Sequence, residues 1–336
     1  MRYIFFLSVL NWFCSDSLQE QNTFLGAGVD VFKFFGDLSV RIRTTPRNDT
    51  GLRWLFRDTL FYPFNYDSTL ISSNNKTKIT FKVELCDDLE ALYSAFFRSI
   101  HIEGMDDSWR AFTGSWTSKL AARKLGISHS HITQSRSYLL VMIDWYNQQA
   151  SLNLTEDIIT SNLSEQAAKF AEFLSPNETA TLNNFITNIG SHYVSSYVIG
   201  DGLFQVFVFK ENSYRELKVM LKTSHFNVEK MINFFSSVYR NSVGHIMVKS
   251  GDFYLTNWIR KTFKKDSFGN NIYPPTLLEI YKQPILLKLI KNRINKQVLM
   301  KLNLKLLDNI FIEKPKKDWF RETVDNRLKL YETNIR

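Results

Sequence analysis

Two β-rich segments place the strongest constraint on how this chain can fold. Residues 136–146 are a nearly continuous run of apolar and β-forming side chains, too apolar for the edge of a sheet, and residues 203–209 are a second strand of β-branched and aromatic side chains. Around them, residues 87–125 and 164–189 space their apolar side chains as helices do. With 336 residues, 44% of them hydrophobic, the chain can bury a large core. The pattern therefore predicts a mixed α+β fold with inner strands.

The remaining elements are predicted from periodicity and from turn residues. Alternating apolar and polar side chains predict strands at 38–43, 79–85 and 244–258, the last with a turn at residues 250–252. Residues 213–241 and the chain after Pro274 are predicted to be mostly helical. The strand expected at 191–210 is predicted to break at Gly200-Asp201-Gly202, because glycine weakens or bends a strand.

The first 17 residues have the pattern of a secretory signal peptide. Arg2 is followed by an apolar stretch at 3–13, and Ser15 and Ser17 supply small residues before a cut after Ser17. A buried first strand is the alternative. Cleavage would remove Cys14 and leave Cys86 alone, most simply as a buried thiol at a strand end. A secreted, extracellular chain would also expose the candidate glycosylation sites Asn48, Asn75, Asn153, Asn162 and Asn177.

Positive charge is concentrated near the C-terminus. Residues 282–336 carry 14 Lys and Arg against 6 Asp and Glu, a surplus of 8 in a chain of net charge +9. The surplus fits a surface for anionic lipid, matrix glycan or an acidic protein, and nucleic acid is not expected for a secreted chain. A solvated amphipathic helix explains it as well, since Leu287, Ile290, Ile294, Val298, Leu302 and Leu306 recur at helical spacing. Residues 296–336 are therefore predicted to be a basic, mostly helical C-terminal segment.

One short motif is more specific than composition. Gly190-Ser191-His192-Tyr193 is followed six residues later by Gly200 and Gly202. This resembles the signature of the membrane-attack-complex/perforin (MACPF) family, in which an aromatic residue precedes the first glycine and the later glycines are adjacent. Here Ile189 replaces the aromatic residue and Asp201 separates the glycine pair. The order of predicted elements also resembles that family, over roughly residues 25–295.

The resemblance implies a bent, twisted four-stranded antiparallel sheet flanked by two helical clusters, with the domain at residues 18–295. It implies structural roles for Gly190, Ser191, His192, Tyr193, Gly200 and Gly202 where a helix feeds the central strand. The single domain and basic tail look most like a secreted arthropod member of the family. The resemblance to that member implies that the chain is a developmental cue, which promotes local activation of a receptor tyrosine kinase by its ligand. Its partners would be extracellular proteins of that pathway, and a second copy of the chain is a further candidate partner.

Catalysis is not expected. None of the HExxH, CxxC, GxSxG or Walker A patterns is present, so we predict no catalytic residue, metal or cofactor. His129 and His131 are interpreted as part of a polar loop, and His192 as a structural histidine. The second function class is a perforin-type pore former whose two helical clusters become membrane hairpins. It ranks lower because neither cluster alternates cleanly: Lys218, Lys222, Glu229 and Lys230 do not fall on one side.

Overall fold

The computed structural model describes residues 25–33, 35–38, 56–59, 71–74, 78–152, 163, 165–176, 178–223, 229, 232, 243–262, 276–294 and 297–334. The expected signal peptide at 1–17 lies outside these residues. So do the five candidate glycosylation asparagines, Asn48, Asn75, Asn153, Asn162 and Asn177. Of the strand expected at 38–43 only Leu38 is described, and its side chain is buried.

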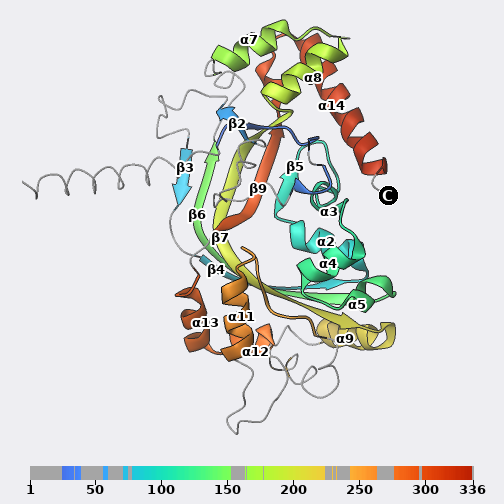
Figure 1. Ribbon diagram of the computed structural model, residues 1–336, viewed down its shortest axis with the longest axis vertical. Helices are drawn as coiled ribbons and strands as arrows, with labels where there is room; N and C mark the ends of the chain where they lie inside the picture. Colours follow the sequence, from blue (N-terminus) through green and yellow to red (C-terminus); the bar gives the residue numbers. More distant parts are fainter. Residues whose placement is uncertain are drawn as a thin grey trace, which may run out of the picture.

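Four long antiparallel strands form the centre of the molecule. They are β4 (Lys78–Cys86), β6 (Ser137–Leu152), β7 (His192–Phe209) and β9 (Val298–Leu306), adjacent in that order. Figure 1 shows β6 and β7 curving along the length of the molecule. Within the described part of the chain, five short strands extend this sheet: β1 (Ala27–Val29), β2 (Phe56–Thr59), β3 (Ile71–Asn74), β5 (Ile100–Ile102) and β8 (Met247–Val248). The predicted α+β class and curved four-stranded core are confirmed.

The first helical cluster covers one face of β6 and β7. It comprises α2 (Leu89–Phe97), α3 (Arg110–Thr113), α4 (Ser118–Leu125) and α5 (His129–Thr133). Leu92 and Tyr93 of α2 share a core with Tyr138 and Leu140 of β6. The helices expected within 87–125 are confirmed, except that residues 100–102 form the strand β5. The polar loop expected at His129 and His131 is wrong, because these residues begin a five-residue helix.

A second set of helices covers the opposite face. α9 (Glu211–Thr223), α11 (Phe253–Thr262), α12 (Leu277–Tyr281) and α13 (Pro284–Lys291) pack on Leu139, Val141 and Leu203. Figure 1 shows α11, α12 and α13 across the sheet from α2 and α4. Because β6 and β7 are covered on both faces here, successive side chains enter different cores, which explains their continuous apolar sequence. The strand expected at 244–258 is wrong beyond β8, since α11 begins at Phe253.

A third core closes the other end of the sheet. There α7 (Glu165–Phe173), α8 (Thr179–Asn188) and α14 (Lys314–Asn334) surround the start of β7 and the end of β9 (Figure 1). The short 3-10 helix η6 (Leu307–Ile310) joins β9 to α14. Phe185 and Phe320 are fully buried at this end, with ring centroids 5.6 Å apart. The helical spacing predicted at 164–189 is confirmed by α7 and α8.

Two predictions about strands need correction. Residues 298–306 form β9, a long strand paired with β7, and not part of an amphipathic helix. The segment 296–336 thus supplies a strand of the sheet as well as a 21-residue helix. The expected break at Gly200-Asp201-Gly202 is also wrong, because β7 runs through it. The irregularities beside it are register shifts, between Tyr146 and Gln148 in the pairing with β6 and between Val198 and Ile199 in the pairing with β9.

Candidate functional site

Gly190 forms the junction between α8 and β7. Its backbone has φ +117°, a region that glycine adopts without steric cost. A Cβ at this position would lie 2.6 Å from the backbone nitrogen of Val29. The neighbouring Ser191 amide donates to the Val29 carbonyl at 3.0 Å. Glycine therefore lets strand β1 approach the start of β7 closely enough to bond to it.

His192 is fully buried, and both ring nitrogens have partners. Nε2 lies 2.9 Å from the backbone carbonyl oxygen of Glu103, and Nδ1 lies 2.9 Å from Oγ of Ser191. Burial lowers the pKa of His192 to about 4, so the ring is neutral at pH 7. A carbonyl only accepts, so we assign the hydrogen to Nε2, and Nδ1 accepts from the Ser191 hydroxyl. The ring therefore joins the start of β7 to the segment after β5.

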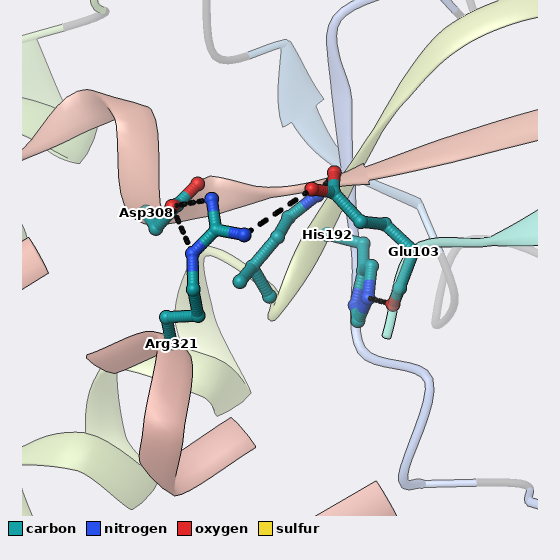
Figure 2. A network of polar contacts seen from close by, with 5 residues as sticks. Glu103, His192, Asp308 and Arg321 are labelled. Atoms are coloured by element: carbon teal, nitrogen blue, oxygen red, sulfur yellow. Dashed lines mark hydrogen bonds and ion pairs between the residues drawn. The ribbon is translucent and has the colours of Figure 1, made fainter. Parts of the chain in front are cut away.

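Glu103 connects this junction to the C-terminal elements. Its carboxylate accepts from the Leu306 amide at 2.9 Å and lies 3.7 Å from Nη1 of Arg321. Figure 2 shows the Arg321 guanidinium between the carboxylates of Glu103 and Asp308. Nε of Arg321 donates to Oδ2 of Asp308 at 2.9 Å. Burial raises the pKa of Asp308, and the bond from Arg321 opposes that rise.

Tyr193 is the last of the four consecutive signature residues and lies in the core. It pairs with Lys305 of β9 on one side and with Gly28 of β1 on the other. Its side chain is 2% exposed, and burial raises its pKa to about 12. The first four signature residues thus hold four segments together: the end of α8, β1, the segment at Glu103 and β9.

The two later glycines lie further along β7, against β6. Gly200 is opposite Tyr146, and a Cβ on Gly200 would lie 2.0 Å from the Trp145 carbonyl oxygen. Gly202 is opposite Asp144, whose Oδ1 would lie 2.6 Å from a Cβ on Gly202. The structure therefore places the signature at two points of one strand, and close backbone approach explains glycine at the second.

A polar cluster that the sequence analysis missed surrounds this second point. Asp201 is 1% exposed, and its Oδ1 accepts from the amides of Gly202 at 2.7 Å and Ser250 at 2.9 Å. Burial raises the pKa of Asp201 to about 6. Beside it, Lys249 and Asp144 form an ion pair at 2.8 Å with little exposure of either side chain. The sequence did contain a signal for this cluster: an aspartate between two glycines of a predicted strand, where acidic residues are rare.

These contacts hold the chain in place and do not form an open reaction centre. Among the described residues, no group of three or more His, Cys, Asp or Glu could hold a metal ion. His192 is enclosed, and its nitrogens bond within the protein. No helix within the described ranges combines the length and the apolar content needed to cross a membrane.

Asp201→Asn tests the buried carboxyl. The asparagine oxygen can keep both amide bonds, but the side chain no longer titrates. An aspartate whose pKa rises on folding, here from 3.8 to about 6, destabilises the fold as pH increases through that window. The variant should therefore gain about 3 kcal/mol relative to wild type between pH 4 and pH 7.

Urea unfolding at each pH measures this difference. Asp318→Asn, on an exposed side chain, is the matched control and should follow wild type across the range. A constant difference between Asp201→Asn and wild type would contradict a raised pKa at this site.

Comparison with known proteins finds a similar fold among solved structures. No family model matches the chain, and no curated protein does. The structure of GNIP1Aa from Chromobacterium piscinae matches with a TM-score of 0.53 and 11% identity, over 93% of this chain and 56% of that one. A putative cell invasion protein with a MAC/perforin domain from Bacteroides thetaiotaomicron matches with a TM-score of 0.47 and 12% identity, over 90% of this chain and 60% of that one. The chain spans less than two thirds of either protein.

A third structure, the perforin-like membrane protein astrotactin-2, matches at a TM-score of 0.34 and 11% identity, over 81% of this chain and 92% of that one. At these identities the likeness concerns the fold alone. The observed arrangement is a curved antiparallel sheet of β4, β6, β7 and β9, with helical clusters on both faces. The chain therefore shares the fold of GNIP1Aa, an α+β arrangement that agrees with the one expected from the resemblance to the MACPF/perforin family.

Proposed function

We propose that this chain is a secreted, non-enzymatic extracellular protein that acts as a developmental cue. In this proposal it resembles Torso-like and promotes local activation of the Torso receptor tyrosine kinase by its ligand, in terminal patterning or in growth and developmental timing. The signal-peptide pattern at 1–17 and the MACPF/perforin-like fold support it. The proposal gives the domain a binding role at the cell surface without requiring it to perforate a membrane.

The charge on the first helical cluster is the observation that carries this choice. Its segment includes Asp87, Asp88, Glu90, Arg98, Glu103, Asp106, Asp107 and Arg110. A charged Arg or Lys on the lipid side of a membrane strand costs about 2–4 kcal/mol at the bilayer centre. In the folded protein several of these charges have partners, such as Arg98 with Glu84 at 2.7 Å. The cluster is thus better suited to remain folded than to form strands that face lipid.

Contacts between the two clusters support the same choice. Asp87, beside α2, accepts from the Tyr214 hydroxyl at 2.7 Å and lies 2.5 Å from Nζ of Lys218, both on α9. The bond from Lys218 lowers the pKa of Asp87. Because Asp87 is largely exposed, this pair contributes little energy, but it joins the clusters across the end of the sheet.

The basic C-terminal segment is a weaker candidate for the partner surface than its charge suggests. Several of its cations bond within the protein: Arg321 to Asp308, Arg327 to Asn183, and Lys316 to the Ala171 carbonyl. Lys301 and Lys305 lie on the exposed side of β9 and are our proposed contacts for an anionic membrane or matrix surface.

Two assays with the purified mature chain test the proposal. In cells that express the Torso receptor, receptor phosphorylation by a limiting amount of ligand should increase when the chain is added. Dye should stay inside anionic liposomes from about pH 5 to 7.5, since the charged first cluster disfavours membrane strands. An unchanged phosphorylation signal from correctly folded protein would contradict the signalling role.

A specific feature of α2 favours pore formation as the second candidate. If residues 89–97 became extended, Leu89, Ala91, Tyr93, Ala95 and Phe97 would form one apolar face. The nine residues of α2 reach the lower end of the roughly 9–11 that a membrane strand needs. No comparable apolar face follows in residues 105–118, which would form the second strand of the hairpin.

Liposomes can separate the two candidates with a matched pair of variants. Ala91→Lys places a charge on that apolar face, whereas Ser94→Lys places it on the opposite face. Both positions are half-buried in the folded helix. A pore former would release dye as wild type and as Ser94→Lys, and lose release about 30-fold or more as Ala91→Lys. A signalling cue should release none in any form.

A further inference from the structure

A cavity of about 240 Å³ lies between the first helical cluster and the sheet. Residues of α2, α3 and α4 form one wall, and residues of β7, β8 and β9 form the other. Its lining is mostly apolar and includes the aromatic residues Phe96, Phe97, Phe112, Trp116 and Phe204, together with Met300. The polar network of Figure 2 is not part of its lining.

The size and lining suit a flexible hydrocarbon. An apolar cavity of about 150 Å³ binds benzene, so by the same ratio about 240 Å³ holds roughly ten carbon atoms. Aromatic and methionine side chains contact an alkyl chain without requiring a fixed orientation. The hydrocarbon part of a single-chain molecule therefore fits the space better than a polar ligand.

The charges around the cavity select the head group. Arg123, Lys124 and Lys249 are among the lining residues, and that set contains no Asp or Glu. Lys249 pairs with Asp144 at 2.8 Å, and Arg123 and Lys124, in the last turn of α4, bring two more positive charges to this wall. An anionic head group complements this wall, and a cationic one does not.

Trp116 adds an independent observation. Its Nε1 is buried and has no hydrogen-bond partner among the described residues, although its ring lines the cavity. A buried N–H without an acceptor costs roughly 1–3 kcal/mol, and a ligand oxygen would recover part of that cost. The indole thus supplies the directional contact that the two flexible cations lack.

We propose that this cavity binds the anion of a single-chain amphiphile, a fatty carboxylate of about ten carbons. The chain lies among the aromatic side chains, and the carboxylate lies toward Trp116, Arg123 and Lys124. Because both walls contact the ligand, binding also stabilises the docking of the first helical cluster on the sheet. The inference is independent of the function proposed above.

Titration calorimetry with decanoate, below its micelle concentration, tests the proposal. We expect saturable binding of one decanoate per chain, about tenfold weaker binding of decanol, and no binding of decyltrimethylammonium. Saturating decanoate should also raise Tm. Absence of saturable decanoate binding, or equal binding of the cationic amphiphile, would overturn the proposal.

Two variants locate the site. Ile100→Trp adds bulk at a half-buried lining position and should weaken binding at least about tenfold. Arg123→Gln/Lys124→Gln should weaken it about three- to tenfold. The control Arg260→Gln/Lys261→Gln makes the same charge change in the last turn of α11, away from the cavity, and should bind as wild type.

Circular dichroism and Tm establish that each variant is folded before titration. Wild-type affinity in folded Ile100→Trp would place binding elsewhere and overturn the proposal. If Ile100→Trp does not fold, the surface pair at Arg123 and Lys124 decides. Equal affinities of that pair and its control would then count against the site.

Discussion

Gly190→Ala is expected to destabilise the protein by about 2–5 kcal/mol and to reduce secretion sharply. At φ +117° an alanine carries backbone strain of about 1–2 kcal/mol. Its Cβ would also lie 2.6 Å from the nitrogen and 2.9 Å from the carbonyl oxygen of Val29. Both are backbone atoms that cannot rotate away, so β1 must separate from β7, at about 1–3 kcal/mol more.

Alanine substitutions at two other glycines distinguish the cost of backbone strain from the cost of steric crowding. Gly251 has φ +68° and no atom within 4 Å of the position that a Cβ would occupy, so Gly251→Ala should cost only the strain, about 1–2 kcal/mol. Gly200→Ala carries no positive-φ strain but meets the Trp145 carbonyl oxygen at 2.0 Å, and should be at least as harmful as Gly190→Ala. Urea unfolding and secreted yield measure all three. Equal effects of Gly190→Ala and Gly251→Ala would disprove the close-approach explanation.

His192→Ala is expected to cost about 3–5 kcal/mol at pH 7. The change leaves the Glu103 carbonyl and the Ser191 hydroxyl without their ring partners and opens a cavity in a fully buried site. The loss should be in folding and secretion. Activity per folded molecule should be retained, because the ring is enclosed and acts by joining segments.

The loss should also depend on pH. A histidine whose pKa falls from 6.5 to about 4 on folding contributes stability above pH 6.5 that is lost as pH falls toward 4. This contribution is about 3 kcal/mol, so the variant should approach wild type at about pH 4. His101→Ala, at an exposed position of β5, is the control and should change little at any pH. Normal secretion of His192→Ala with lost activity would refute the structural role.

Local patterns predicted much of the architecture correctly. The apolar sequence of β6 and β7 specifies inner strands because no exposed face is available for it. The helical spacing of α2 and α4 follows from burying one side of each helix against the sheet. The signature also located the α8–β7 junction, since only glycine permits the backbone at residue 190.

Residues 298–306 show where periodicity alone is ambiguous. Positions 298, 302 and 306 are four apart, which fits a helix face, but four is also a multiple of the strand period of two. The intervening Met300 and Leu304 are buried and Lys301 and Lys305 exposed, which is the strand pattern. Pairing with β7 decides the outcome, because β7 would otherwise leave this edge without backbone partners.

The polar contacts at the α8–β7 junction also depend on tertiary structure, unlike the elements that local patterns predict. Sequence determined the fold class, the inner strands, most of the helices and the glycine-dependent turn, because each depends on side chains within a few residues of one another. Only the tertiary structure decided that Glu103 meets His192, 89 positions away, and Leu306, 203 positions away. Such pairs leave no local period, since they form only when the curved sheet brings distant segments together in a buried site where each polar group must find a partner.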